Sequence, residues 1–289
     1  MMYTISSGCM RAVIDSTGAQ LMSLQSADGI QYLWQGDPKY WSDRSLTIFP
    51  YVARLTQGSY RYQGQLYHMP IHGFAPTAAF SVTEQTDCAV TFTLESCPEF
   101  YAQYPFLFRY SIRYRLENAT LHVEITVENK DEKTMYFGLG GHPGINVPLE
   151  KGLCFEDYVL EFPPCQPRRV EFTLACFITG RELPFPLEGN RLPLSHHMFD
   201  EDAIVLKGIP GEVTLKSLKG HRGVTLIAPD FPVFGCWHMP KTDAPYICLE
   251  PWSSLPSHQD IIEDLEKQAD LISLPAMGVY RTTWSLQCY

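Results

Sequence analysis

Two histidines and one glutamate of this chain stand in settings that suit proton transfer. His142 follows two glycines and precedes a proline, which keeps its backbone out of the helical region. His72 stands in a Pro-Ile-His-Gly segment, and Glu250 closes an apolar run at residues 246–249. A histidine with a pKa of about 6.5 gives and recovers a proton at neutral pH, and a partly desolvated carboxylate is a stronger base. The three residues together suit general acid/base catalysis, although a lone histidine in a tight turn is more typical of a structural residue.

Two further residues would complete a polar cleft for a small ligand. Arg54 follows an apolar run at 49–53, so its guanidinium either reaches back to the surface or points into a cleft. Trp252 follows Glu250 and Pro251, and its flat face suits the C–H face of a sugar ring; the alternative is an ordinary core residue. Both interpretations depend on a fold that brings these distant segments together.

The composition favours a large, acidic, globular protein. The chain has 289 residues, 45% of them hydrophobic, and a net charge of 22 − 32 = −10. An acidic chain without a basic cluster argues against binding to nucleic acid or to an anionic membrane. The N-terminus lacks a signal-peptide pattern and no apolar run is long enough to span a bilayer, so we expect a cytoplasmic protein.

The nine cysteines are expected to be reduced. None forms a Cys-x-x-Cys pair, and none has zinc-ligand spacing to a histidine, so we expect no metal site. Cys154, Cys236 and Cys248 stand in apolar runs, which predicts core positions for them.

Period-two alternation predicts strands along most of the chain. The runs 110–116 and 121–127 predict an antiparallel hairpin with one buried face, and 58–62 with 65–69 predicts a second. The run 135–139 predicts a strand that ends at the glycines before His142. Further short strands are expected at 89–95, 158–162, 203–207, 212–218, 223–228, 234–239, 246–249 and 279–286.

One segment has a helical pattern. Ile261, Ile262, Leu265 and Ala269 share a stripe, and Ser257 or Asp260 would cap the start of this helix. With no linker or internal repeat, the sequence predicts a single all-β domain over residues 1–289: a large antiparallel β-sandwich with few short helices.

The order of the polar residues resembles that of the aldose 1-epimerase (mutarotase) family, most closely its LacX-like branch. The chain presents Arg54, His72-Gly, His142-Pro, Asn146 and Glu250-Pro-Trp, with spacings of 142 − 72 = 70 and 250 − 142 = 108. The resemblance covers essentially the whole chain, and the ordered set is more specific than any one motif.

This resemblance implies a fold, a reaction and a role for each residue. The fold would be a galactose mutarotase-like β-supersandwich, and the reaction would interconvert the α and β anomers of a free aldose through the open-chain aldehyde. Glu250 would be the base and His142 the acid, while Arg54 and His72 would bind the sugar. The partner would be a monosaccharide, no cofactor or metal would be required, and the oligomeric state is left open.

The resemblance also implies a substrate-binding aspartate before an apolar strand. We assign it to Asp202, with Asp200 and Glu201 as open alternatives, and a solvated acidic turn is the competing interpretation. The chain departs from the branch at Pro76, where an arginine is common, and at Ser253-Ser254.

Three other functions are compatible with the same residues. A hexose-6-phosphate 1-epimerase would need a cationic pocket, and the candidates for it are Arg44, Arg168, Arg169 and Arg181. A non-catalytic sugar-binding or sensing protein would keep the fold without the reaction. A glycosidase is disfavoured because it normally needs two suitably placed carboxylates, and only Glu250 has a convincing setting.

Overall fold

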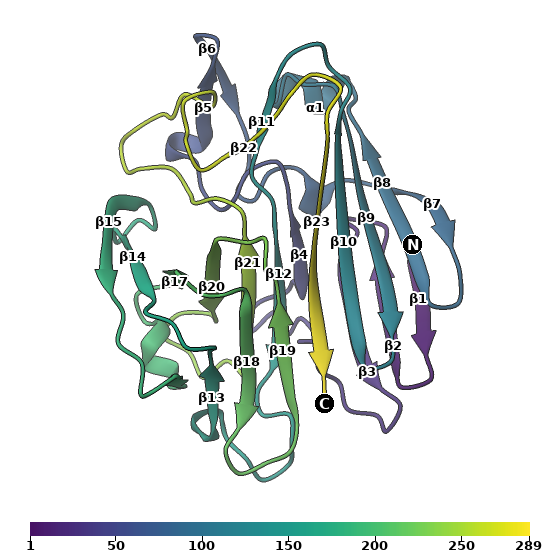
Figure 1. Cartoon of the computed structure of the whole chain (residues 1–289), viewed down its shortest axis with the longest axis vertical. Helices are drawn as coiled ribbons and strands as arrows, with labels where there is room; N and C mark the ends of the chain where they lie inside the picture. The colour runs from purple at the N-terminus through teal and green to yellow at the C-terminus, as the bar shows by residue number, and fades with distance from the viewer.

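The computed structural model describes residues 1–289, and antiparallel sheets make up most of it (Figure 1). The largest sheet has nine strands, of which β23, β10, β9, β8 and β7 lie side by side in Figure 1. In spatial order its strands are β16 (Arg191–Pro193), β13 (Tyr158–Glu161), β18 (Glu212–Ser217), β19 (Gly223–Ile227), β23 (Val279–Cys288), β10 (Thr120–Asn129), β9 (Phe108–Glu117), β8 (Ala89–Glu95) and β7 (Ser81–Gln85).

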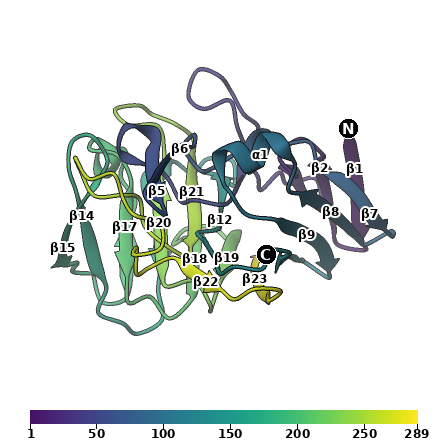
Figure 2. The same cartoon turned by 90° about the horizontal axis from the view of Figure 1, so that it is seen from above.

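A seven-stranded sheet forms the second layer. Figure 2 shows its strands succeeding one another from β15 through β14, β17, β20 and β21 to β12. In spatial order its strands are β15 (Ile178–Pro184), β14 (Arg168–Phe172), β17 (Ile204–Lys207), β20 (Val233–Trp237), β21 (Tyr246–Trp252), β12 (Gly140–Asn146) and β4 (Ser45–Ile48).

Smaller elements complete the chain. The remaining strands are β1 (Met2–Ser7), β2 (Met10–Asp15) and β3 (Leu21–Ser26) in one sheet, and the pairs β5 (Ser59–Tyr62) with β6 (Gln65–His68) and β11 (Met135–Phe137) with β22 (Ile272–Leu274). The helices are α1 (Pro98–Gln103) and four 3₁₀ turns, η1 (Thr56–Gly58), η2 (Ala75–Thr77), η3 (Phe155–Asp157) and η4 (His196–Phe199). None of these helices has the length and apolar character needed to cross a membrane.

The hairpin β9–β10 confirms the clearest strand prediction. Leu116 pairs with Leu121, and every second residue of both strands is buried. The other face is polar: the carboxylate of Glu124 accepts hydrogen bonds from Arg113 and Arg115 across the strands. The alternation therefore places one face on the core and the other in solvent, as expected for an antiparallel sheet with one covered face.

The core lies between the two large sheets. Leu215, Leu226 and Leu286 from the nine-stranded sheet belong to the same buried cluster as Leu206, Ile247 and Leu249 from the seven-stranded sheet. The sheets approach closely at Gly141 of β12, where an added Cβ would lie 2.6 Å from Cζ2 of Trp284 on β23. This position has space only for glycine, because the indole ring occupies the volume of a side chain.

The opposite face of the seven-stranded sheet, termed here the outer face, is also covered. All residues of β21 are buried, and Tyr246, Cys248, Glu250 and Trp252 alternate with inward-facing Ile247 and Leu249. Two small apolar clusters flank the outer face, one around Trp252 and Val205 and one around Trp34 and Tyr246. Polar groups on this face therefore lie at the base of a covered depression rather than on open surface.

Three predictions about local structure are wrong. Residues 260–269 form no helix, because Arg61 of β5 bonds to the main chain of this segment on both sides, donating to Glu263 and accepting from Leu265. The peptide groups on either side of Asp264 thus form a parallel bridge to Arg61 and are not available for helical hydrogen bonds. Ile261 is exposed, whereas Leu265 is buried, so the two do not share a buried face. The one α-helix is α1, a six-residue segment too short to show a helical period.

The other two corrections concern His142 and Cys154. His142 does not stand at a strand end: β11 stops at Phe137, and a new strand, β12, includes the glycines and His142. Its backbone is extended, as the following proline requires, but the glycines serve close packing of sheets rather than a turn. Cys154 is exposed, whereas Cys236 and Cys248 are buried as predicted, and all nine cysteines are free thiols.

Candidate active site

His142 and Glu250 face each other on neighbouring strands of the outer face. Gly140 pairs with Trp252 and Gly144 with Cys248, so the antiparallel register sets His142 opposite Glu250. Nε2 of His142 lies 3.3 Å from Oε2 of Glu250, and the two residues are only 8% and 1% exposed. An imidazole and a carboxyl in direct contact, both shielded from bulk water, form a pair able to exchange a proton.

Burial dominates the ionisation of this pair. It raises the pKa of Glu250 well above its ordinary value, although the indole Nε1–H of Trp252 donates to Oε2 at 3.2 Å and opposes the shift. Burial also lowers the pKa of His142 well below its usual value, and the neighbouring His72 adds to the effect. A neighbouring carboxylate would by itself favour charged His142, but desolvation by burial outweighs that effect.

His72 lies against His142 with a fixed tautomer. The two rings are 5.4 Å apart, centroid to centroid, and nearly perpendicular. Nδ1 of His72 accepts the backbone N–H of Ala53 at 3.3 Å, so the neutral ring carries its proton on Nε2. Burial lowers the pKa of His72 to about 4, and the Arg54 guanidinium acts in the same direction. His72 is thus a neutral hydrogen-bond donor at neutral pH.

Arg54 and Asp202 form the more open side of the site. Nη2 of Arg54 lies 4.0 Å from Oδ2 of Asp202, and the arginine side chain is 42% exposed. Asp202 also accepts from Sγ of Cys176 and from the backbone N–H of Ala203. Ala53, His72 and Asp202 all have positive φ angles, of 55°, 63° and 87°. Such strained backbone is held by its surroundings and is common where loops present functional side chains.

An aromatic wall encloses His142. The ring of Trp41 packs over it at 4.9 Å, and Trp237 of β20 meets it edge-on at 5.7 Å. Together with Arg54, His72 and Asp202, these rings line a cavity of about 490 Å³, termed here the inner cavity. The mixture of flat apolar rings and convergent polar groups matches the general composition of small-ligand sites.

A cluster of possible metal ligands also lies here. His142, Cys248 and Glu250 each place one donor atom within 4.8 Å of the others. Burial raises the pKa of the Cys248 thiol well above its ordinary value, with the nearby Glu250 as a further cause. Metals bind the thiolate rather than the thiol, so the environment of Cys248 opposes metal binding and suits a neutral, proton-exchanging pair at His142 and Glu250.

Comparison with known proteins agrees with the geometry. A family model described as aldose 1-epimerase matches residues 1–262. The chain belongs to the aldose 1-epimerase family. It is similar to the chromosomal protein LacX of Lactococcus lactis subsp. lactis, with 32% identity over 271 residues that cover 89% of this chain and 90% of LacX.

Two solved structures extend the likeness of this aldose 1-epimerase family member to the whole fold. A galactose mutarotase-like protein from Lactobacillus casei is 32% identical, with a TM-score of 0.95 and complete coverage of both chains. A galactose mutarotase related enzyme from Lactobacillus acidophilus is 31% identical, with a TM-score of 0.94 over 100% of this chain and 97% of that one. The predicted galactose mutarotase-like β-sandwich is therefore confirmed, and the membership supports a mutarotase-type activity on a small sugar.

The structure of this family member brings together the predicted site residues. Arg54, His72, His142, Asp202, Glu250 and Trp252 all line the inner cavity. Of the acidic alternatives, Glu201 also lines it, whereas Asp200 turns away and pairs with His197. Asn146 lies outside the cavity, where its amide donates to the carbonyls of Gln31 and Leu33 and so secures the end of β12.

Some contributors had little or no signal in the sequence. Trp41, Trp237 and Cys176 line the inner cavity, but none of them belongs to the ordered set that carries the family resemblance. The proximity of all three to His142 or Asp202 depends on strand pairing and loop packing between segments far apart in sequence.

Proposed function

We propose that this protein is an aldose 1-epimerase that interconverts the α and β anomers of a free aldose. The observation that carries the proposal is the buried contact of 3.3 Å between Nε2 of His142 and Oε2 of Glu250, at the base of a cavity of about 490 Å³. An acid and a base side by side match a reaction that moves one proton on and one proton off the same end of a sugar ring.

The reaction proceeds by two matched proton transfers. Glu250 as carboxylate takes the proton of the anomeric hydroxyl, the C1–O1 bond gains double-bond character, and the bond between C1 and the ring oxygen breaks. His142 as imidazolium delivers its proton to that ring oxygen. The open-chain aldehyde then turns about the C1–C2 bond, and ring closure on the other face returns both protons. The net charge of the pair is the same before and after.

The resting pair and the reactive pair differ only in the position of one proton. Desolvation by burial favours the neutral acid of Glu250 beside neutral His142. The reactive form, carboxylate beside imidazolium, has the same net charge across the 3.3 Å contact. Hydroxyl groups of a bound sugar donate hydrogen bonds to the carboxylate, and donors of this kind favour the charged form. Substrate binding therefore promotes the reactive arrangement.

The surrounding residues hold and polarise the sugar. The Nε2–H of His72 is a neutral donor suited to a ring oxygen or hydroxyl, since its Nδ1 is engaged by Ala53. Arg54 supplies further donors and Asp202 supplies acceptors. Trp252 orients Glu250 through its indole N–H, a positioning role in addition to the predicted sugar contact.

The charges of the cavity favour a free sugar over a sugar phosphate. A phosphate requires convergent arginines or lysines, and Arg54 is the single such residue in the lining, beside Glu201, Asp202 and Glu250. Arg44 bonds to the carbonyl of Met22 and to Gln35. Arg168 and Arg181 are paired with Glu182 and Glu171, and Arg169 lies outside the lining.

The test is polarimetric measurement of mutarotation by the purified chain. We expect acceleration of α-glucose or α-galactose equilibration, with little dependence on salt, and a lower kcat/KM for glucose 6-phosphate. A large preference for the phosphate that weakens as salt rises would indicate a cationic site and overturn the assignment. Sugar binding without any acceleration would indicate the non-catalytic alternative.

A further inference from the structure

The carboxylate of Asp202 is held by a thiol from a hairpin distant in sequence. Oδ2 of Asp202 accepts a hydrogen bond from Sγ of Cys176 at 2.6 Å, and Oδ1 accepts the backbone N–H of Ala203 at 2.9 Å. No other hydrogen bond reaches this carboxylate, and Nη2 of Arg54 stays 4.0 Å from Oδ2. Cys176 is therefore the one side chain that fixes the orientation of Asp202 by a hydrogen bond.

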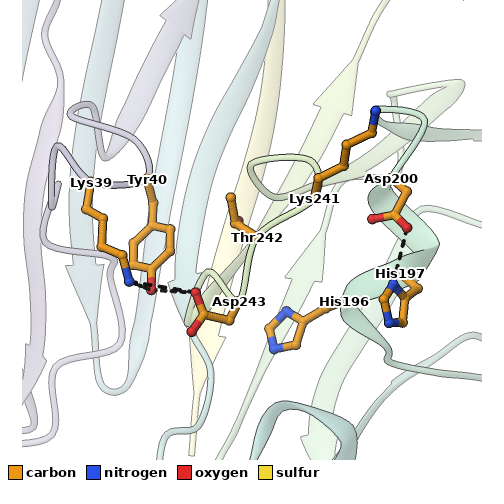
Figure 3. Close-up of a pocket in the computed structure, with 8 residues that line it drawn as sticks. All are labelled: Lys39, Tyr40, His196, His197, Asp200, Lys241, Thr242 and Asp243. Atoms are coloured by element: carbon orange, nitrogen blue, oxygen red, sulfur yellow. Dashed lines mark hydrogen bonds and ion pairs between the residues drawn. The ribbon is translucent and has the colours of Figure 1, made fainter.

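The two acidic residues before Asp202 are arranged differently. The carboxylate of Asp200 is turned to Nδ1 of His197 at 3.2 Å, beside a separate polar hollow (Figure 3). Glu201 lines the inner cavity but is exposed and makes no hydrogen bond or ion pair. Among residues 200–202, Asp202 is thus the one acidic residue that both lines the inner cavity and is held there by a partner from another segment.

The turn between β14 and β15 aims the thiol at Asp202. The backbone N–H of Cys176 donates to the carbonyl of Thr173 at 3.0 Å, and the N–H of Thr173 donates to the carbonyl of Phe177 at 2.8 Å. Cys176 has a φ angle of 63°, in the left-handed region that residues with a Cβ seldom adopt. Asp202 at the other end of the contact also has a positive φ angle, so strained backbone on both sides presents the two groups to each other.

The thiol of Cys176 is a donor and not a nucleophile. Burial raises its pKa to about 11, with the hydrogen bond to Asp202 as a further cause, so it keeps its proton at neutral pH. A thiol has a single proton to donate, whereas each oxygen of a carboxylate can accept two hydrogen bonds. The contact therefore orients Oδ2 of Asp202 and leaves it able to accept another hydrogen bond.

The thiol also decides how Asp202 and Arg54 share the cavity. The guanidinium of Arg54 is 42% exposed and has Asp202 as its only side-chain partner, at a distance too long for a direct hydrogen bond. Without the donor on Cys176, the carboxylate would be free to move toward Arg54 and form a charge-assisted hydrogen bond of about 2.8 Å. Such a pair would occupy both the donors of Arg54 and the acceptors of Asp202.

We propose that Cys176 is a positioning residue whose thiol holds the carboxylate of Asp202 apart from Arg54, so that both groups remain free to bind sugar hydroxyls. The inference rests on the proposed function, since it concerns the binding of the aldose in the inner cavity. The thiol acts through Asp202 and takes no part in the two proton transfers.

The experiment measures kcat and KM for glucose and galactose in Cys176→Ala and Cys176→Ser. Alanine, serine and cysteine all have a Cβ, so the strain of the positive φ angle is the same in the three proteins. Losing the hydrogen bond in Cys176→Ala is expected to raise KM by about fivefold to tenfold. Since Asp202 lies away from the His142–Glu250 pair, kcat should stay within about twofold. Serine restores a donor, so Cys176→Ser should return KM toward the wild-type value.

The control is Cys165→Ala, which removes a half-buried free thiol outside the inner cavity and should leave both kinetic constants unchanged. An unchanged KM in Cys176→Ala would reject the positioning role. Equal increases of KM in Cys176→Ala and Cys176→Ser would also reject it, because the hydrogen bond would then have no part in the effect. A fall of kcat without a rise of KM would point to a general disturbance of the site and would contradict the proposal as well.

Calorimetric titration with glucose or galactose separates this inference from the proposed reaction, because binding needs no turnover. If no sugar is turned over, the proposed function fails, but weaker binding in Cys176→Ala that Cys176→Ser restores still supports the positioning role. If the wild type binds neither sugar, both proposals fail.

Infrared spectroscopy tests the thiol–carboxylate contact without a sugar. The difference spectrum between the wild type and Cys176→Ala isolates the S–H stretching band of Cys176, and this band should move when Asp202→Asn replaces the carboxylate acceptor. A band that is the same in Asp202→Asn and in the wild type would show that the thiol does not hold Asp202.

Discussion

The hairpin β9–β10 and the pair β12–β21 are both antiparallel, yet the chain uses them differently. In β9–β10, buried and accessible residues alternate, and the accessible face carries ion pairs such as those of Glu124 with Arg113 and Arg115. In β12–β21 nearly every residue is buried, and the polar residues His142 and Glu250 have only each other and Trp252 as close polar partners.

The difference shows how burial decides what a carboxylate does. The pKa of Glu124 is lowered, because the two arginines offset its partial burial, and the residue serves solubility and sheet pairing. The pKa of Glu250 is raised because no cation offsets its burial. A glutamate is thus a stable anion at position 124. At position 250 its pKa depends on what surrounds the carboxyl, so it suits a group that accepts and releases a proton.

The largest effect is expected for removal of the buried carboxylate. Glu250→Gln preserves shape and removes the proposed base, so kcat for mutarotation should fall by roughly 10²–10⁴. The matched control is Glu124→Gln, which removes a carboxylate from β10 and should leave kcat within about twofold, since partly exposed ion pairs contribute about 1 kcal/mol or less to stability. Near-wild-type polarimetric rates for folded Glu250→Gln would show that Glu250 is no more important for the reaction than Glu124.

Substitution of His142 and substitution of His72 should change different kinetic parameters. His142→Asn removes the proposed acid and should reduce kcat by about 10² or more. His72→Asn removes a donor that holds both ground state and transition state, so kcat should fall less and KM should rise. Steady-state kinetics on glucose or galactose distinguishes the two. The opposite pattern would exchange their roles.

The close approach of the sheets gives a prediction about stability. In Gly141→Ala the new methyl group would collide with the ring of Trp284, so the free energy of unfolding should fall by about 1–3 kcal/mol, as overpacked cores generally show. Gly8→Ala is the control, since nothing lies within 4 Å of its added Cβ, and its effect should stay within about 0.5 kcal/mol. Chemical denaturation of the two variants measures the difference, and equal stabilities would contradict the tight contact.

The smallest expected effect concerns the pH dependence of stability, to which His72 and Glu250 contribute with opposite signs. The pKa of His72 is lowered from 6.5 to about 4, so on acidification the unfolded chain binds a proton that the folded chain refuses, and stability falls. The pKa of Glu250 is raised above 4.5, so on alkalinisation the unfolded chain releases a proton that the folded chain keeps, and stability also falls. Between pH 4.5 and 6.5 the two slopes oppose each other.

Melting temperatures at pH 4.5, 5.5 and 6.5 test these signs. Stability should rise more steeply with pH in Glu250→Gln than in the wild type, and less steeply in His72→Asn. Parallel curves for the three proteins would show that neither group changes its pKa on folding.

The sequence predicted the solvent-facing half of the fold better than the half that contains the site. Alternation located β9 and β10 and their buried residues, because one face is accessible to solvent and the other is buried. In β12 both faces are buried, so no alternation marked it as a strand, and His142 was placed just after the end of the strand predicted at 135–139. The segment 260–269 had a helical stripe, but the bridge to Arg61 claimed its peptide groups.

The site itself was predicted through motifs rather than through geometry. Arg54, His72, His142 and Glu250 of the ordered set meet in the inner cavity, whereas Asn146 of the same set lies outside it. The set did not identify Trp237 or Cys176, whose places depend on pairing between segments distant in sequence. It also left Asp200 and Glu201 as alternatives to Asp202; Glu201 and Asp202 both line the cavity, whereas Asp200 does not.

The positions of the tryptophans allow ligand binding to be followed by intrinsic tryptophan fluorescence. Three of the five in the chain, Trp41, Trp237 and Trp252, line the inner cavity, and the indole N–H of Trp252 donates to the carboxyl of Glu250, the proposed base. A sugar that displaces water from these rings alters the polarity around three of the five tryptophans at once. Occupancy of the cavity can then be followed in the unlabelled protein by its emission spectrum, including in variants that bind a sugar and no longer turn it over.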